Sequence, residues 1–223
     1  MKRFALLALL LVPTVADAQW KEGFNFRDTL AYCTDPTDSQ IACYTSGVGC
    51  DSPYPTTAGG VTFGANNNSG DNKRDRDAGI DCRLAGISFQ QNNSASKNDF
   101  RVDLPASGVY NFRLAMGSGG GFSAGANQKM EVYDSDDATV LLTVTDASVA
   151  ADHWVDAGGT ERTSASDWVT NNASVQLTFS GTAAYIKWGY GDGSTSGNTC
   201  MSHFELEQVA TDILPQLQAI GEE

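Results

Sequence analysis

The clearest pattern in the chain is an alternation of apolar and polar residues on both sides of a turn, over residues 100–116. Apolar side chains occupy every second position from Phe100 to Leu104 and again from Tyr110 to Met116, and residues 105–108 between them read PASG. A period of two is typical of a β-strand with one face toward a core and one toward water. The stretch therefore predicts two strands joined as a hairpin.

The same alternation recurs in short segments bounded by turn-forming residues. Further strands are expected around Phe24 and Phe26, Val61 and Phe63, Ile80 to Phe89 with a bulge at Gly86, Met130 and Val132, Val140 to Val144, Val175 to Phe179, Ile186 and Trp188, and Phe204 and Leu206. Long loops are expected at 28–57, 66–77, 117–125 and 147–172. Many short strands without a long helix predict an all-β fold, an antiparallel β-sandwich of the jelly-roll type.

The two ends of the chain are distinct from this sandwich. Residues 1–18 combine Lys2 and Arg3, an apolar run too short to span a bilayer, and small residues before position 19, which is typical of a secretory signal peptide. Cleavage is expected near Ala18, which leaves one domain at 19–210. The tail at 211–223 has apolar residues at a spacing that allows a short helix. The sequence thus predicts a secreted, extracellular protein without membrane insertion.

The chain is strongly acidic, with a formal net charge of −13 at pH 7. Such a surface repels phosphate backbones and anionic lipid heads, so nucleic acid and membrane surfaces are poor partners. Neutral ligands or cations fit better. The alternative is that the acidity serves solubility alone.

Cysteine usage fits an exported protein. There are five cysteines, and Cys33 and Cys43 flank a turn-rich segment, which predicts a local disulfide between them. The odd number leaves at least one thiol free or bonded to another chain. The pairing of Cys50, Cys82 and Cys200 stays open. No C-x-x-C spacing occurs and only two histidines are present, which argues against a zinc cluster.

The central segment also resembles a known family. The run VDLP at 102–105, followed by GVYNFRL at 108–114 and by the closing strand HFELE at 203–207, resembles the galactose-binding-like jelly roll of malectin-type domains and carbohydrate-binding modules. The resemblance extends over residues 24–209 in outline, and its sharpest part is the central pair of strands. It implies a non-catalytic β-sandwich that often binds sugar and often holds a structural calcium ion.

Sugar binding needs aromatic rings that lie against the apolar face of a pyranose, together with side chains that bond its hydroxyls. Loop aromatics with nearby carboxylates supply both, and the candidate ligand-binding residues are Trp154, Asp152, Tyr190, Asp192 and Phe122. Trp154 is the leading candidate, and the alternative is that its ring fixes its own loop. Trp168 and Trp188 fit the core better, since Trp188 is in phase with Ile186.

Calcium prefers several oxygen ligands from one loop. Asp71, Asp75 and Asp77, which precede Gly79, form the candidate calcium site, and residues 134–137 (DSDD) are a second possibility. Neither matches the spacing of an EF-hand loop, and basic residues interrupt the first set. Solvated turns are the alternative interpretation.

A catalytic motif is present only in outline. Residues 121–125 (GFSAG) fit the pattern G-x-S-x-G around Ser123, but a nucleophile elbow needs a strand before the serine and a helix after it. Here further glycines precede the serine and a strand is expected after it. Asp152 with His153 or His203 would complete a triad in chain order, although nothing in the sequence brings them together.

Three functions follow from these observations. The first is a secreted, non-catalytic protein that binds glycan, with calcium as a structural cofactor. The second is a structural or assembly subunit of an extracellular fibre, surface layer or virion-like particle, because an acidic sandwich with an odd cysteine and an apolar tail suits self-association. The third is a serine hydrolase.

Overall fold

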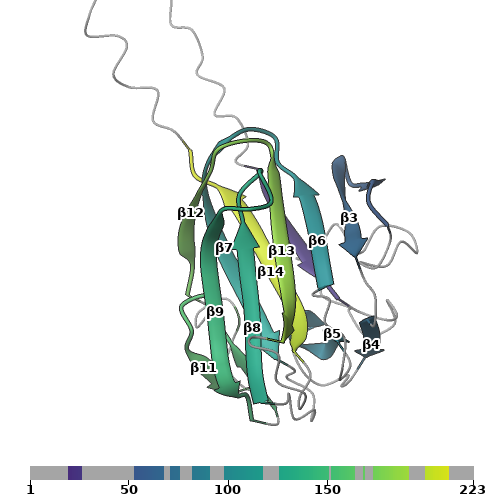
Figure 1. Ribbon diagram of the computed structural model, residues 1–223, viewed down its shortest axis with the longest axis vertical. Helices are drawn as coiled ribbons and strands as arrows, with labels where there is room; N and C mark the ends of the chain where they lie inside the picture. The colour runs from purple at the N-terminus through teal and green to yellow at the C-terminus, as the bar shows by residue number, and fades with distance from the viewer. Residues whose placement is uncertain are drawn as a thin grey trace, which may run out of the picture.

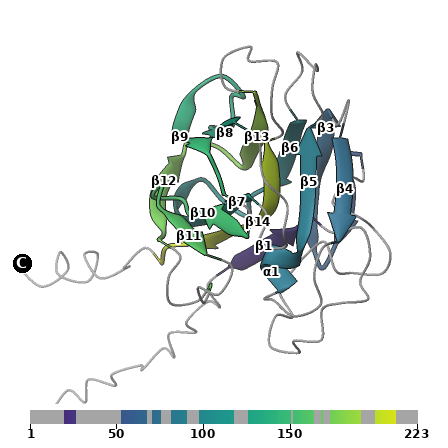
Figure 2. The same ribbon diagram turned by 90° about the horizontal axis from the view of Figure 1, so that it is seen from below.

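The computed structural model describes residues 20–26, 53–67, 71–75, 82–90, 98–117, 126–150, 152–163, 168, 173–190 and 199–210. Within these ranges the chain forms two antiparallel β-sheets and one short helix (Figure 1). The sheets pack face to face, as the view from below also shows (Figure 2). The predicted all-β, antiparallel sandwich is therefore confirmed.

The first sheet, called sheet A, has eight strands. Their bounds are β1 Lys21–Asn25, β4 Asp71–Asp75, β5 Gly86–Gln90, β7 Gly108–Gly117, β10 His153–Val155, β11 Glu161–Thr163, β12 Val175–Phe179 and β14 Cys200–Gln208. The order is β11-β10-β7-β14-β5-β4, with β12 also paired to β7 and β1 to β14. The long strands β7 and β14 therefore form the centre of sheet A.

The second sheet, called sheet B, has six strands. Their bounds are β2 Thr56–Ala58, β3 Val61–Asn67, β6 Asn98–Asp103, β8 Ala126–Tyr133, β9 Val140–Ser148 and β13 Ala183–Tyr190. The order is β2-β3-β6-β13-β8-β9. Neighbouring strands are mostly far apart in sequence, so the chain crosses repeatedly between the sheets.

The two sheets enclose one large apolar core. Each strand contributes alternate residues to it, as period-two strands of a half-buried sheet do. Its centre is a group of aromatic rings in mutual edge and stacking contact: Phe24, Phe26, Phe63, Phe100, Phe112, Trp188 and Phe204. Trp188 is 3% exposed and Trp168 is 2% exposed, which confirms the expectation that both are buried.

The central alternating stretch forms two strands, but the predicted hairpin is wrong. β6 pairs with β3 and β13 in sheet B, whereas β7 pairs with β10, β12 and β14 in sheet A. Residues 104–107 therefore cross from one sheet to the other. The crossing lets the apolar faces of both strands meet in the core, and the Tyr110 hydroxyl donates a hydrogen bond of 2.7 Å to the Ala106 carbonyl at this corner.

Three further expectations need correction. The strand predicted from residue 80 begins later, because residues 82–85 form the short helix α1 (Cys82–Ala85) and β5 starts directly after it. The polar segment at 66–77, expected to be a loop, includes the end of β3 and all of β4. The segment at 147–172 contains β10 and β11. Within the described residues, no helix is long and apolar enough to cross a membrane.

Candidate functional site

The outer face of sheet B presents a row of side chains that runs across its strands. In the register of the sheet, Tyr185 on β13 lies opposite Arg101 on β6 and opposite Tyr133 on β8. Tyr133 in turn lies opposite Val140 on β9. We call Arg101, Tyr185, Tyr133 and Val140 the tyrosine row. Neighbouring strands are about 4.8 Å apart, so the row is about 14 Å long.

Cations pack against the rings of this row and of Tyr54, which lies beside it. The Arg101 guanidinium is 4.4 Å from the Tyr54 ring centroid and donates a hydrogen bond of 3.2 Å to the Tyr185 hydroxyl. The Lys187 ammonium is 4.8 Å from the Tyr133 ring centroid. Such contacts fix the rings in place before any ligand arrives. Tyr133 and Tyr54 are partly exposed, whereas Tyr185 is only 9% exposed, so Tyr185 mainly supports its neighbours.

Carboxylates complete the face. Asp103 accepts hydrogen bonds from Arg101 at 2.9 Å and from the Tyr54 hydroxyl at 3.0 Å. Lys187 contacts Asp137 at 2.6 Å and Asp99 at 3.4 Å, while further along the face Lys129 pairs with Glu131 at 2.7 Å.

The three cations and four carboxylates of this face nearly balance, although the chain as a whole carries −13. The face is thus polar and aromatic with almost no net charge.

The central ion pair of this face is partly desolvated. Burial raises the pKa of Asp99, and the Lys187 ammonium opposes that rise. Burial alone would lower the pKa of Lys187, but its hydrogen bond to Asp137 and the charge of Asp99 outweigh burial, so the pKa is raised. Lys187 therefore stays charged at neutral pH, and the pair offers charge-assisted hydrogen bonds to a ligand.

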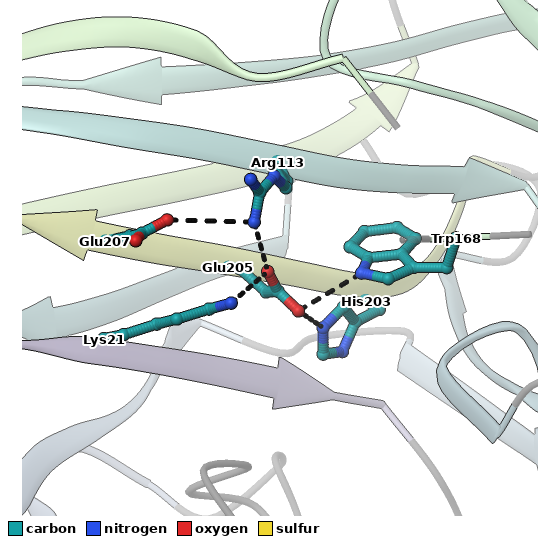
Figure 3. Close-up of polar contacts among 6 residues, drawn as sticks. All are labelled: Lys21, Arg113, Trp168, His203, Glu205 and Glu207. Carbon is teal, nitrogen blue, oxygen red and sulfur yellow. Dashed lines mark hydrogen bonds and ion pairs between the residues drawn. The ribbon is translucent and has the colours of Figure 1, made fainter. Parts of the chain in front are cut away.

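The outer face of sheet A holds a different cluster, drawn in Figure 3. Glu205 on β14 accepts hydrogen bonds from Arg113 at 3.4 Å, Trp168 Nε1 at 3.2 Å and His203 Nε2 at 3.3 Å. It also forms an ion pair with Lys21 at 3.4 Å. The Glu205 side chain is 7% exposed, while Lys21 and Arg113 are about one third exposed. Burial would raise the pKa of Glu205, but the hydrogen bond from His203 and the charges of His203, Lys21 and Arg113 outweigh it, so the pKa lies well below its usual range.

This cluster is covered on one side by a small second core. Trp168 packs against Trp154, with ring centroids 5.5 Å apart, and against the edge of His203 at 4.9 Å. Leu84 of α1 and Ala115 of β7 complete the contact. His203 is fully buried beneath these rings. The arrangement stabilises the outer face of sheet A and leaves little surface for a ligand there.

The expectation that Trp154 presents its ring on a loop is wrong. Trp154 lies in β10, is 0% exposed, and donates from Nε1 to the Thr163 carbonyl at 3.2 Å. A ring without exposed surface cannot lie against a sugar in this structure. Asp152 is exposed at the start of β10 with a φ of 61°. Phe122, Asp192 and the side chain of Tyr190 lie outside the described residues, so their roles stay predictions.

The predicted calcium site and the predicted disulfide involve side chains outside the described residues, so both stay predictions. Asp71 and Asp75 lie in β4, but their side chains, like Asp77, lie outside the described residues. Cys33 and Cys43 also lie outside them.

The second calcium candidate, residues 134–137, is a turn: Asp136 caps it by accepting from Thr139 and Ala138, and Asp134 accepts from Ser135 and Ser180. Among the described residues, no three His, Cys, Asp or Glu side chains are placed to hold a metal.

The hydrolase prediction also stays open. Ser123 lies outside the described residues. Of its two candidate bases, His153 pairs with Glu161 at 2.9 Å and His203 is buried against Glu205.

Sequence reasoning missed the tyrosine row. Its residues come from β6, β13 and the consecutive strands β8 and β9, and each strand alone shows only a single outward position. The available signal was that Tyr133, Tyr185 and Arg101 all occupy the outward phase of strands whose inward phase was read correctly.

Comparisons with known proteins give the following. No family model and no curated protein matches the chain. Among solved structures, a carbohydrate-binding module of lichenase 5A from Cellvibrio mixtus, in complex with cellotriose, is similar at 13% identity and a TM-score of 0.37, over 66% of this chain and 92% of that one. The carbohydrate-binding module TmCBM61, in complex with β-1,4-galactotriose, is similar at 8% identity and a TM-score of 0.31, over 67% of this chain and 90% of that one.

A third similar structure belongs to a larger enzyme. The isomalto-dextranase of Arthrobacter globiformis, complexed with panose, is similar at 17% identity and a TM-score of 0.34 over 67% of this chain, which spans 21% of that one. Two of the three are carbohydrate-binding modules. All three TM-scores lie below 0.5.

Proposed function

We propose that this chain is a secreted, non-catalytic glycan-binding protein, and that the tyrosine row on the outer face of sheet B holds the glycan. The observation that supports this most is the near-neutral face of tyrosines and ion pairs on a chain of charge −13. A neutral ligand gains from aromatic contact and charge-assisted hydrogen bonds without opposing that net charge. Secretion rests on the signal peptide predicted at residues 1–18.

The accessible apolar part of the face lies at Tyr133 and Val140. Val140 is 46% exposed and is the cross-strand neighbour of Tyr133. Two residues further along the strands and on the same face, Lys187 of β13 lies opposite Glu131 of β8. A glycan running across the strands would therefore place ring faces over the first pair and hydroxyls beside the second. An extended neutral chain suits this layout better than a single sugar.

Affinity electrophoresis on a panel of neutral polysaccharides tests the proposal. Tyr133→Ala should lower affinity for the retained polysaccharide by about tenfold. Loss of one aromatic contact costs about 1.4 kcal/mol of binding free energy, which corresponds to a factor of ten in affinity. Tyr133→Phe keeps the ring and removes only the 2.8 Å hydrogen bond to Glu131, so it should bind more tightly than Tyr133→Ala. Gln176→Ala, exposed on β12 of sheet A, is the matched control.

Two results contradict the proposal. One is that no neutral polysaccharide retards the wild type. The other is that Tyr133→Ala is retarded as strongly as the wild type, which would place binding elsewhere on the molecule.

A further inference from the structure

The edges of the two sheets differ in how they are protected. Natural sheets avoid edge-to-edge pairing by short strands or charged side chains. β2 and β11 have three residues each, and β4 reads DNKRD, with four charges in five residues. β9 has nine residues, VLLTVTDAS, of which the first six carry no charge. In the described part of the chain β9 pairs only with β8, so its other edge lacks both of these protections, although a bulge at Leu141 is a third kind of edge protection.

The exposure of the apolar side chains of β9 also indicates that this edge is an interaction surface. Val140 is the one large apolar side chain that is exposed among the described residues, at 46%. Leu141 and Leu142 are only partly buried at the margin of the core. β12, which lies beside β9 (Figures 1 and 2), is uncharged as well (VQLTF). This side of the sandwich thus combines an unpaired strand edge with exposed apolar surface.

We propose that β9 pairs in antiparallel fashion with β9 of a second copy of this chain, forming a two-fold symmetric dimer. The strand is complementary to itself, because antiparallel pairing of two copies sets valine, leucine and threonine against one another and brings no like charges together over residues 140–145. Copies that each carry −13 repel each other over most of their surface, and they approach most easily where charge is absent. Residues 140–145 are such a place, and a strand of valine, leucine and threonine is well suited to cross-strand packing.

The alternation of inward and outward side chains along β9 restricts how the two copies of the strand can pair. Val140, Thr143 and Thr145 follow the outward phase set by their partners on β8, with a bulge at Leu141, while Leu142 and Val144 face inward. Paired residues must share a face. Among the pairings that satisfy this, a two-fold axis between the two copies of Thr143 keeps the paired residues within the uncharged part of the strand, 140–145. Leu142 then lies opposite Val144, and Val140 lies opposite Thr145 of the second copy.

This pairing has a structural consequence for the tyrosine row. Antiparallel pairing of two identical edge strands places the two-fold axis perpendicular to the sheet, so the outer faces of both sheets B lie on the same side. The row ends at Val140 on β9, which faces Thr145 of the second copy in this register, so the two rows would lie on one side of the dimer but be displaced from each other along the strands. The dimer itself does not depend on glycan binding.

Light scattering and sedimentation as a function of concentration test the dimer. The wild type should shift from the monomer mass to twice that mass, and added salt should strengthen the shift because it screens the repulsion. Val140→Lys with Thr145→Lys places like charges opposite each other and should hold the protein monomeric. Val140→Lys with Thr145→Glu places opposite charges there and should restore the dimer.

All substituted side chains are exposed, and thermal unfolding of each variant checks that the fold is intact. A wild type that keeps the monomer mass at millimolar concentration and high salt overturns the proposal. So does a folded lysine–lysine variant that dimerises like the wild type. Rescue by the lysine–glutamate pair, in contrast, supports this register specifically.

Discussion

At the scale of single residues, Glu205 shows how a buried charge is kept in this fold. Its carboxylate is 7% exposed, accepts hydrogen bonds from Arg113, His203 and Trp168, and forms an ion pair with Lys21 of β1 (Figure 3). Removing one member of a buried ion pair usually costs more than the pair contributes, because the remaining charges lose their partner. Here the partners Lys21 and Arg113 are about one third exposed. Water can solvate their charges when Glu205 is removed, so the loss of stability is smaller.

We expect Glu205→Gln to lower the free energy of unfolding by about 2–3 kcal/mol at pH 7, below the range for fully buried pairs. Glu207→Gln is the matched control: Glu207 is on the same strand and contacts Arg113 at 3.8 Å, but it is 25% exposed, so its loss should cost less than about 1 kcal/mol. Urea unfolding of the three proteins measures both changes. Equal costs for the two variants would show that the cluster does not depend on Glu205.

The sequence predicted the burial of two tryptophans correctly but not the position of the third. The burial of Trp168 and Trp188 followed from their phase or surroundings, but Trp154 was assigned to a loop. The strand that contains it has three residues, too few for a period of two to be visible among the glycines and serines around it. Its hydrogen bond to Thr163 and its contact with Trp168 are tertiary facts without a local pattern.

At the scale of elements, the antiparallel pairing of β10 with β7 depends on Gly117. Gly117 has a φ of 122°, and a Cβ atom there would lie 2.8 Å from the His153 carbonyl oxygen. Its own carbonyl accepts a hydrogen bond of 2.6 Å from the Ser202 hydroxyl of β14. The last residue of β7 thus joins β10 and β14 at a point where only glycine fits.

Gly117→Ala should therefore lower the free energy of unfolding by about 3 kcal/mol, from backbone strain and a contact with rigid backbone. Gly159→Ala is the control, because Gly159 also has a positive φ, 79°, but open space around it; it should cost about 1 kcal/mol. Guanidinium unfolding compares the two. A Gly117→Ala variant no less stable than Gly159→Ala would mean that β10 shifts freely on β7.

Strands were predicted well, whereas their partners were not. A period of two identifies the buried face of β6 and of β7 but does not say in which sheet each strand lies, so the turn at 105–108 was read as a hairpin. The tyrosine row was missed for the same reason. It exists only through the register of β6, β13, β8 and β9, and register between distant strands is set by packing of the whole core.

At the scale of the whole molecule, two carboxyl groups act in opposite directions on stability. Glu22, half-buried on β1, has a pKa raised by burial from 4.5 to about 7. Glu205 has a pKa lowered from 4.5, because its donors outweigh burial. A raised carboxyl pKa gives stability that is present at low pH and lost as pH rises from 4.5 through 7. A lowered one gives stability that is present above 4.5 and lost as pH falls below it.

The free energy of unfolding should therefore be greatest near pH 5 and fall on both sides. The shift of Glu22 would correspond to about 3 kcal/mol for a buried group, and its partial exposure reduces the expected loss toward pH 8 to about 1 kcal/mol. Urea unfolding from pH 3 to pH 9 measures the profile. Glu22→Gln should reduce the slope on the alkaline side, where Asp99 with its raised pKa still contributes, and Glu205→Gln should reduce the slope on the acid side, where Asp136 with its lowered pKa still contributes. A wild-type profile that rises steadily from pH 5 to pH 8, or a Glu22→Gln variant that leaves this side unchanged, would contradict the assignment of that titration to Glu22.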